Sequence, residues 1–198
     1  MSETRVPVPG AGDALLVVDV QRDFLPGGSL AVPDGARVLA PLNRCLALFA
    51  KGGLPVFATR DWHPGDHCSF RAQDGPWPDH CVAGSAGAEF SEALQLPAQT
   101  RIVSKGTRAD QEAYSGFAGT DLEGRLRHEC VRRLFVAGLA TDYCVAQTVE
   151  DARQRGFDVV VLRDAIAAVD ANPGDGDRAI ERMQRQGAIF VKSDELFT

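Results

Sequence analysis

Six short, strongly apolar runs recur along this chain, and segments with a helical spacing of apolar residues separate most of them. The first run, ALLVVDV, is apolar on both of its alternating faces, which is typical of a strand buried inside a parallel sheet. Strands that alternate with helices predict a three-layer, doubly wound α/β fold around a mainly parallel six-stranded sheet. The predicted strands span residues 14–20, 54–61, 101–104, 132–139, 158–165 and 188–192.

The helices between these runs are predicted from apolar spacing and from residues that begin or end helices. In the first helix Pro41 falls in the first turn, where proline is tolerated, and the pair Gly52-Gly53 ends the helix. Thr141 or Asp142 is the predicted N-cap of the helix that runs to Arg155. The predicted helices span residues 36–50, 87–94, 120–128, 141–155 and 175–186.

Length and composition indicate a soluble, single-domain protein. The 198 residues, 44% hydrophobic and 24% charged, suit one globular domain over 1–198, with 61–86 as an insertion and 1–12 expected to be disordered. The net charge of −6 argues against nucleic acid or an anionic membrane as a partner. Without a long apolar run or a secretory pattern, the chain is expected to be cytoplasmic, with its five cysteines as thiols.

Polar residues that can do chemistry follow four of the predicted strands. Asp19 and Asp61 close the first two strands, Lys105 follows the third, and the segment 140–144 follows the fourth. Ligands of open α/β sheets bind beyond the carboxyl ends of the strands. We therefore expect these residues to converge at one edge of the sheet.

Cys144 falls in the first turn of a predicted helix. A helix N-terminus stabilises a thiolate, so we expect a lowered pKa for Cys144 and a role as nucleophile. Asp19 is placed to accept a proton, and Lys105 to pair with Asp19. Taken singly, each residue has a simpler explanation: a core cysteine, a carboxylate that caps a loop or forms a salt bridge, and a solvated lysine.

The stretch 62–86 lacks a regular period and holds three of the four histidines and both tryptophans. Such a long loop in a compact domain is usually functional or disordered. One interpretation is an open site for a catalytic divalent metal such as zinc, iron or manganese, formed by Asp61, His63 and His80. A second is a closed structural zinc site with the ligands His63, Cys68, His80 and Cys81, and a third has no metal, with the histidines bonded to loop carbonyls.

Several segments together resemble a known family. They are VVDVQRDFLPGGSL (17–30), TRDWHPGDHCSF (59–70), WPDHCV (77–82), SKGT (104–107), YSGF (114–117) and VAGLATDYCV (136–145). The sequence resembles the nicotinamidases (pyrazinamidases) of the isochorismatase-like cysteine hydrolases from about residue 14 to about residue 192. The first and last segments are shared across the wider superfamily, whereas the histidine segment and WPDHC are typical of the nicotinamidase branch.

The resemblance implies a role for individual residues. Cys144 matches the nucleophile, Asp19 the general base and Lys105 the third member of the triad. The matches to the metal ligands are Asp61, His63 and His80, and His67 lies near them without being counted as a ligand. The Leu139–Ala140 peptide matches a cis bond, and the amides of Ala140 and Cys144 match an oxyanion hole. The residues that match the ring pocket are Phe24, Leu30, Trp77, Tyr114 and Tyr143.

The activity implied by the resemblance is hydrolysis of nicotinamide, and of pyrazinamide-type amides, to the acid and ammonia through a thioester, a reaction of NAD salvage. The implied cofactor is one divalent metal ion, with zinc expected before iron or manganese, and the partner is the small-molecule substrate. A homo-oligomer is compatible with the sequence.

Two other functions fit parts of the pattern. The same triad serves relatives that act on N-carbamoyl compounds or other small amides, but those branches generally lack the pattern of Asp61, His63 and His80. A protein that only binds a pyridine ligand or pairs subunits would not need an intact triad. The isochorismate-hydrolysing branch generally lacks the cysteine. The segment 106–114 is variable in the family and is expected to tune the substrate.

Overall fold

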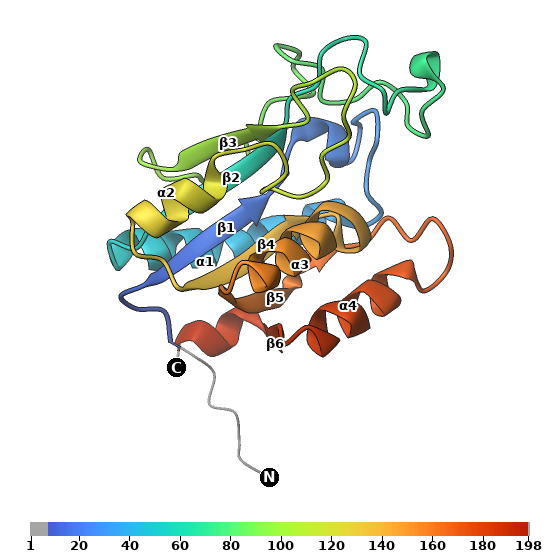
Figure 1. The fold of residues 1–198 in the computed structure, drawn as a ribbon. Helices are drawn as coiled ribbons and strands as arrows, with labels where there is room; N and C mark the ends of the chain where they lie inside the picture. Colours follow the sequence, from blue (N-terminus) through green and yellow to red (C-terminus); the bar gives the residue numbers. More distant parts are fainter. Residues whose placement is uncertain (1–7, 198) are drawn as a thin grey trace.

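The core of the protein is one sheet of six strands, all parallel to their neighbours. The computed structural model describes residues 8–197, and the strands lie in the order β3-β2-β1-β4-β5-β6 (Figure 1). This confirms the predicted doubly wound sheet. The strands are β1 (Asp13–Val18), β2 (Val56–Asp61), β3 (Arg101–Lys105), β4 (Arg133–Leu139), β5 (Asp158–Ala167) and β6 (Ile189–Val191).

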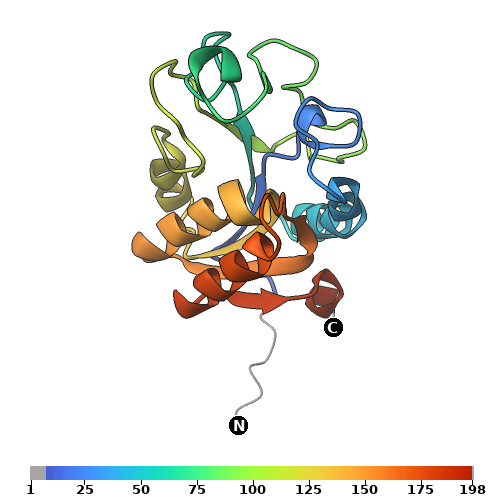
Figure 2. The same ribbon diagram turned by 90° about the vertical axis from the view of Figure 1, so that its right-hand side faces the viewer.

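Helices cover both faces of the sheet and complete three layers. The helix α1 (Leu39–Lys51) packs on one face, where it meets Leu15 and Val17 of β1. On the other face α2 (Leu122–His128), α3 (Ala146–Gln154) and α4 (Asp175–Arg185) pack against the alternate strand residues, among them Leu16 and Val18 (Figure 2). Two separate apolar clusters therefore hold the central strand from both sides.

The close approach of β4 to β1 depends on a glycine. Gly138 has φ 125°, and the β4–β5 register shifts between Val136 and Gly138. A Cβ at this position would overlap the carbonyl oxygen of Val18 and lie 2.7 Å from the Val18 nitrogen. Only glycine fits here, so the ends of β1 and β4 can lie side by side.

The helix predicted over 87–94 is wrong. These residues form turns, and Phe90 makes an antiparallel bridge with Gln21, just beyond β1. The amide of Ser91 also donates to the carbonyl of Val20 at 3.1 Å. The backbone of this segment is thus used to pair with the chain that leaves β1, which is incompatible with a helix.

The start of the helix after β4 also differs from the prediction. Thr141–Val145 form a π-helical turn, and α3 follows directly. Neither predicted N-cap residue makes a capping bond there. The Asp142 carboxylate instead accepts the amides of Val169 and Asp170 at 2.9 and 2.8 Å, because the loop after β5 lies beside this turn.

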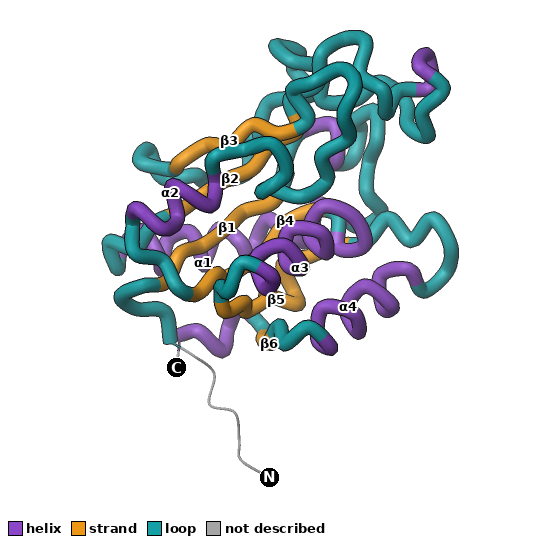
Figure 3. Tube along the Cα trace, in the orientation of Figure 1, coloured by secondary structure: helices purple, strands orange, loops and turns teal. Residues whose placement is uncertain are grey.

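Long irregular segments gather at the carboxyl ends of β1, β2 and β3 (Figure 3). The predicted loop 62–86 contains only a short 3-10 turn, Arg71–Gln73, and isolated bridges. Among residues 8–197, no helix has the length and apolar character needed to cross a bilayer. Of the N-terminal stretch predicted to be disordered, residues 1–7 lie outside the described residues, while Gly10 donates its amide to Asp13 at 2.7 Å.

Candidate active site

The predicted polar residues meet where the chain order of the sheet reverses. This switch point lies between β1 and β4, with Asp19 just past β1 and Cys144 in the π turn past β4. The side-chain donor atoms of Asp19, Asp61 and Cys144 all lie within 4.8 Å of one another. The expectation that the strand ends converge is confirmed, as the geometry of such sheets requires.

Lys105 lies at the centre of this group. Its Nζ is 2.9 Å from Asp19 Oδ2, 2.5 Å from Asp61 Oδ1 and 3.5 Å from Cys144 Sγ. Burial alone lowers the pKa of Lys105, but the charges of Asp19 and Asp61 outweigh it and hold this pKa well above its ordinary value. Lys105 is 1% exposed and paired with two carboxylates, so the alternative of a solvated lysine is wrong.

Asp19 is held in an unusual backbone conformation. Its φ is 49°, in the left-handed region that residues other than glycine seldom adopt. Its Oδ1 accepts the hydroxyl of Thr59 at 2.7 Å, and its buried Oδ2 faces the Lys105 ammonium at 2.9 Å. Burial raises the pKa of Asp19, opposed by Lys105. Its environment thus favours proton uptake.

The thiol of Cys144 has a raised pKa, contrary to the prediction. Burial is the main cause, and the neighbouring carboxylates of Asp19 and Asp61 add to it, while Lys105 opposes them. The prediction considered the helix end but not the desolvation of a side chain only 6% exposed. A thiol with a raised pKa requires a neighbouring base before it can act as a nucleophile, and the Asp19 carboxylate lies beside it.

Asp61, His63 and His80 form a second group, with ligand atoms all within 4.8 Å of one another. The Nδ1 of His63 bonds the carbonyl of Gly106 at 2.8 Å, and the Nδ1 of His80 bonds that of Pro78 at 2.7 Å. A carbonyl only accepts, so each Nδ1 carries a proton, and in the neutral ring each Nε2 keeps its lone pair for a metal. Two imidazoles and a carboxylate held in this way fit a divalent cation.

Glycine is required beside His63. Gly106 has φ 61°, and a Cβ on it would overlap the His63 ring and lie 2.6 Å from Nδ1. The same glycine supplies the carbonyl that orients the ring. The signal in the sequence is the glycine directly after Lys105.

The closed zinc site formed by two histidines and two cysteines is not present. In the part of the chain that the structure describes, neither Cys68 nor Cys81 belongs to a cluster of three or more metal-binding side chains. Burial, followed by nearby carboxylates, raises the pKa of Cys81, which disfavours a thiolate ligand. His67 bonds Ser69 Oγ through Nδ1 at 2.7 Å and the carbonyl of Gln111 through Nε2 at 3.1 Å, so both of its nitrogens are engaged.

A narrow, mostly apolar cavity is lined by Cys144 and by two of the three candidate metal ligands, Asp61 and His80. All five predicted ring-pocket residues line it, together with Asp61, His80, Ala140, Val32 and Val169. The peptide Leu139–Ala140 is cis, as the resemblance implied. Val32 was not predicted and carries no obvious signal. Val169 follows β5, which runs further than predicted, so a correct strand end would have indicated it.

Two aromatic side chains of the cavity wall are joined directly. Trp77 donates its indole N–H to the hydroxyl of Tyr114 at 3.0 Å. Tyr143 packs against both rings, with centroids 5.2 Å from Trp77 and 5.6 Å from Tyr114. The segment 106–114 is thereby tied to the loop 62–86 above the thiol.

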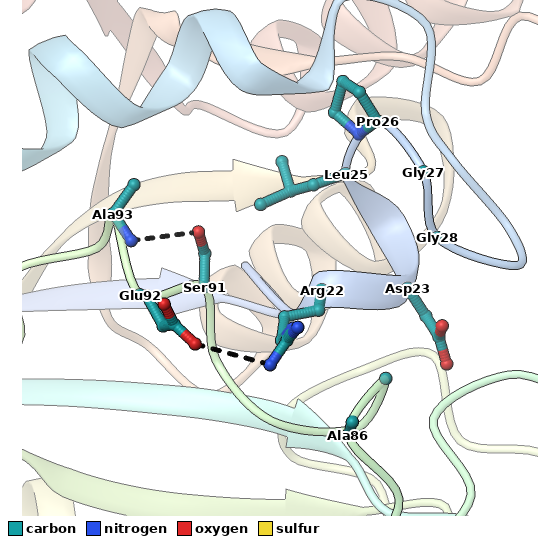
Figure 4. A pocket seen from close by; sticks show the side chains of 11 residues that line it. Arg22, Asp23, Leu25, Pro26, Gly27, Gly28, Ala86, Ser91, Glu92 and Ala93 are labelled. Carbon is teal, nitrogen blue, oxygen red and sulfur yellow. Dashed lines mark hydrogen bonds and ion pairs between the residues drawn. The ribbon is translucent and has the colours of Figure 1, made fainter.

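A wider surface hollow lies apart from this chemistry (Figure 4). It is lined by residues 22, 23, 25–28, 86, 87 and 91–93, and an ion pair between Arg22 and Glu92, at 3.5 Å, crosses it. Neither the predicted triad residues nor the candidate metal ligands line this hollow.

The fold and the site define a class: a doubly wound α/β protein with a cysteine, an aspartate and a lysine grouped at the switch point of its sheet. The pattern of the isochorismatase domain matches residues 13–195, and the chain belongs to the isochorismatase family of enzymes.

Three relatives indicate its place in that family. The nicotinamidase of Escherichia coli (strain K12) is 38% identical over 89% of this chain and 93% of its own length. The pyrazinamidase of Pyrococcus horikoshii, solved in complex with zinc, has a TM-score of 0.88 and 48% identity over 91% of this chain and 99% of its own. N-carbamoylsarcosine amidase from Thermoplasma acidophilum has a TM-score of 0.78 and 31% identity over 92% of this chain and 96% of its own.

Proposed function

We propose that this enzyme hydrolyses nicotinamide, and related pyrazine carboxamides, to the corresponding acid and ammonia. The observation that carries the proposal is one cavity that is lined by Cys144, by aromatic side chains and by Asp61 and His80. The wider resemblance to a nicotinamidase and to a pyrazinamidase supports the choice of substrate.

The first half of the reaction forms a thioester. Asp19 takes the proton of the Cys144 thiol, and the thiolate attacks the carbonyl carbon of the carboxamide. The amides of Ala140 and Cys144 stabilise the negative charge on the carbonyl oxygen. Asp19 then returns the proton to the amide nitrogen, ammonia leaves, and the acyl group remains on the sulfur.

The second half of the reaction releases the acid. Asp19 accepts a proton from water, and the hydroxide attacks the thioester carbonyl. The carbon–sulfur bond breaks, the thiolate of Cys144 recovers the proton from Asp19, and nicotinic acid departs and ionises to nicotinate in water. Throughout, Lys105, 3.5 Å from Sγ, lowers the energy of the thiolate in a buried site.

The metal donors are assigned to substrate recognition. Asp61, His63 and His80 would hold one divalent ion, zinc before iron or manganese, which would supply a Lewis acid for the ring nitrogen of the substrate. The chain itself encloses the flat ring between Phe24, Trp77 and the tyrosines of the cavity, which excludes water and orients the amide toward Sγ.

A substrate panel tests this assignment. Ammonia release is measured from nicotinamide, pyrazinamide, benzamide and N-carbamoylsarcosine with metal-loaded enzyme. We expect the two aza-aromatic amides to be turned over best, with benzamide weaker because it lacks a ring nitrogen. Faster turnover of the carbamoyl compound than of nicotinamide would overturn the substrate and favour the activity of the Thermoplasma relative.

A further inference from the structure

Gln21 is a fully buried glutamine to which neither the reaction nor the cavity assigns a role. Its Oε1 accepts the backbone amide of Asp61 at 2.8 Å. Its Nε2 donates to the carbonyl of Asp61 at 2.7 Å and to that of Ala88 at 2.8 Å. The side chain therefore binds both backbone polar groups of one residue, as a neighbouring strand would.

The partners leave the Gln21 carboxamide only one orientation. The carbonyls of Asp61 and Ala88 can only accept, and the amide of Asp61 can only donate. Turning the carboxamide over would place its N–H groups against the Asp61 N–H and its oxygen between two carbonyls. All three bonds would then be lost inside the protein, where unpaired polar groups are costly.

The Gln21 side chain can reach the Asp61 backbone because of the way β1 ends. The pairing of β1 with β2 continues to Val18 and Thr59, after which Asp19 adopts its left-handed conformation and the chain turns out of the sheet. Asp61 therefore has no strand neighbour on the β1 side. On its other side it pairs with Lys105 of β3. The Gln21 side chain occupies the missing place, so the Asp61 backbone is held from both sides.

We infer that Gln21 is a positioning residue that fixes the carboxylate of Asp61 as a metal donor. The inference rests on the metal centre of the proposed function, but not on its substrate. Asp61 must face the Lys105 ammonium with one oxygen and the His63 imidazole with the other, at 2.5 Å and 3.7 Å respectively. A small shift of its backbone would disturb both contacts. Removing partners that orient metal ligands typically weakens metal binding by about 10–100-fold.

The test is Co²⁺ binding to the metal-free full-length enzyme, followed by the absorption spectrum of the bound ion and without substrate. The variants are Gln21→Met, which keeps the volume and removes all three bonds, and Gln21→Glu, which keeps an acceptor for the Asp61 amide. Gln147→Met, on the exposed face of α3, is the matched control. Leu46→Ala, on the buried face of α1, controls for lost stability, and urea unfolding shows which variants are folded.

We expect Gln21→Met to bind Co²⁺ about 10–100-fold more weakly than the wild type, with an altered spectrum, and Gln21→Glu to lie between them. Both controls should bind within twofold of the wild type. Wild-type affinity and spectrum in Gln21→Met, or equal weakening in Leu46→Ala, would overturn the positioning role. A wild-type protein that binds no stoichiometric Co²⁺ would overturn this inference and the metal centre together. Failure to hydrolyse nicotinamide would affect only the proposed substrate.

Discussion

Lys105 and Asp61 form a buried ion pair, Nζ to Oδ1 at 2.5 Å, that joins the proposed triad to the proposed metal centre. The same ammonium lies 2.9 Å from Asp19 Oδ2, so one cation faces two buried carboxylates. A divalent cation beside Asp61 would supply the remaining positive charge. The two parts of the site are thus electrostatically coupled, so a change of charge in the metal centre should affect the triad, and the reverse.

Replacing Lys105 by methionine should abolish activity and destabilise the fold. Asp19 and Asp61 would be left buried without their cation, and breaking such a pair costs about 3–5 kcal/mol. Urea unfolding measures the loss of stability. Arg108→Met, which removes a fully exposed partner of Asp110, should leave the unfolding midpoint unchanged. Equal midpoints for Lys105→Met and the wild type would show that the buried charges are balanced in another way.

The acid limb of the kcat/KM profile should lie above pH 3.8, the ordinary pKa of an aspartate. Asp19 must be ionised to accept the thiol proton, and burial raises its pKa, so activity falls as the pH drops through that raised value. Thr59→Val removes the hydroxyl that stabilises the carboxylate, so the limb should move to higher pH. Thr100→Val is the control, because the Thr100 hydroxyl has no hydrogen-bond partner among residues 8–197. If the acid limb does not shift in Thr59→Val, Asp19 is not the group that accepts the thiol proton.

Gly106→Ala should lose metal, and Gly53→Ala should not. Both glycines have φ near 60°, so alanine costs about 1 kcal/mol at either position. Apart from its chain neighbours, no described residue lies within 4 Å of a Cβ on Gly53, whereas a Cβ on Gly106 overlaps the His63 ring. Metal content of the purified variants measures the difference. If both variants retain full metal, the His63 ring does not depend on Gly106 for its position.

Trp77→Phe should raise KM for nicotinamide about fivefold with little change in kcat. The substitution removes the hydrogen bond to Tyr114 and part of the aromatic wall of the cavity. We expect the loss in binding free energy to equal that of about one neutral hydrogen bond, which corresponds to the fivefold change in KM. Trp62→Phe is the matched control, since Trp62 stacks against Arg60 at 3.6 Å and does not line the cavity. A fall in kcat alone would place Trp77 closer to the chemistry than to ring binding.

The sheet and the grouping of the site could be predicted because both depend on local patterns. Apolar runs located the strands, and residues after parallel strands must meet at one edge, which brought Asp19, Lys105 and Cys144 together. The segment 87–94 could not be predicted, because its backbone pairs with Gln21 and its neighbours, far away in the sequence. The pKa of Cys144 depends on burial among carboxylates, which helix position alone does not reveal.

Side-chain contacts with backbone groups that are distant in the sequence could not be predicted either. The bonds of Gln21 to Asp61 span 40 residues, and no spacing rule indicates them. Asp142 fits the pattern of an N-cap, yet its carboxylate accepts the amides of residues 169 and 170 in the loop after β5. Such contacts require the tertiary structure.

The most direct test of the proposed chemistry is ammonia release from nicotinamide by the wild type and by Cys144→Ala, with the metal content of both quantified. Turnover by the wild type, lost in a variant that still holds its metal, is the predicted result. Equal turnover in Cys144→Ala would contradict the nucleophile. No turnover by a folded, metal-loaded wild type would contradict the substrate.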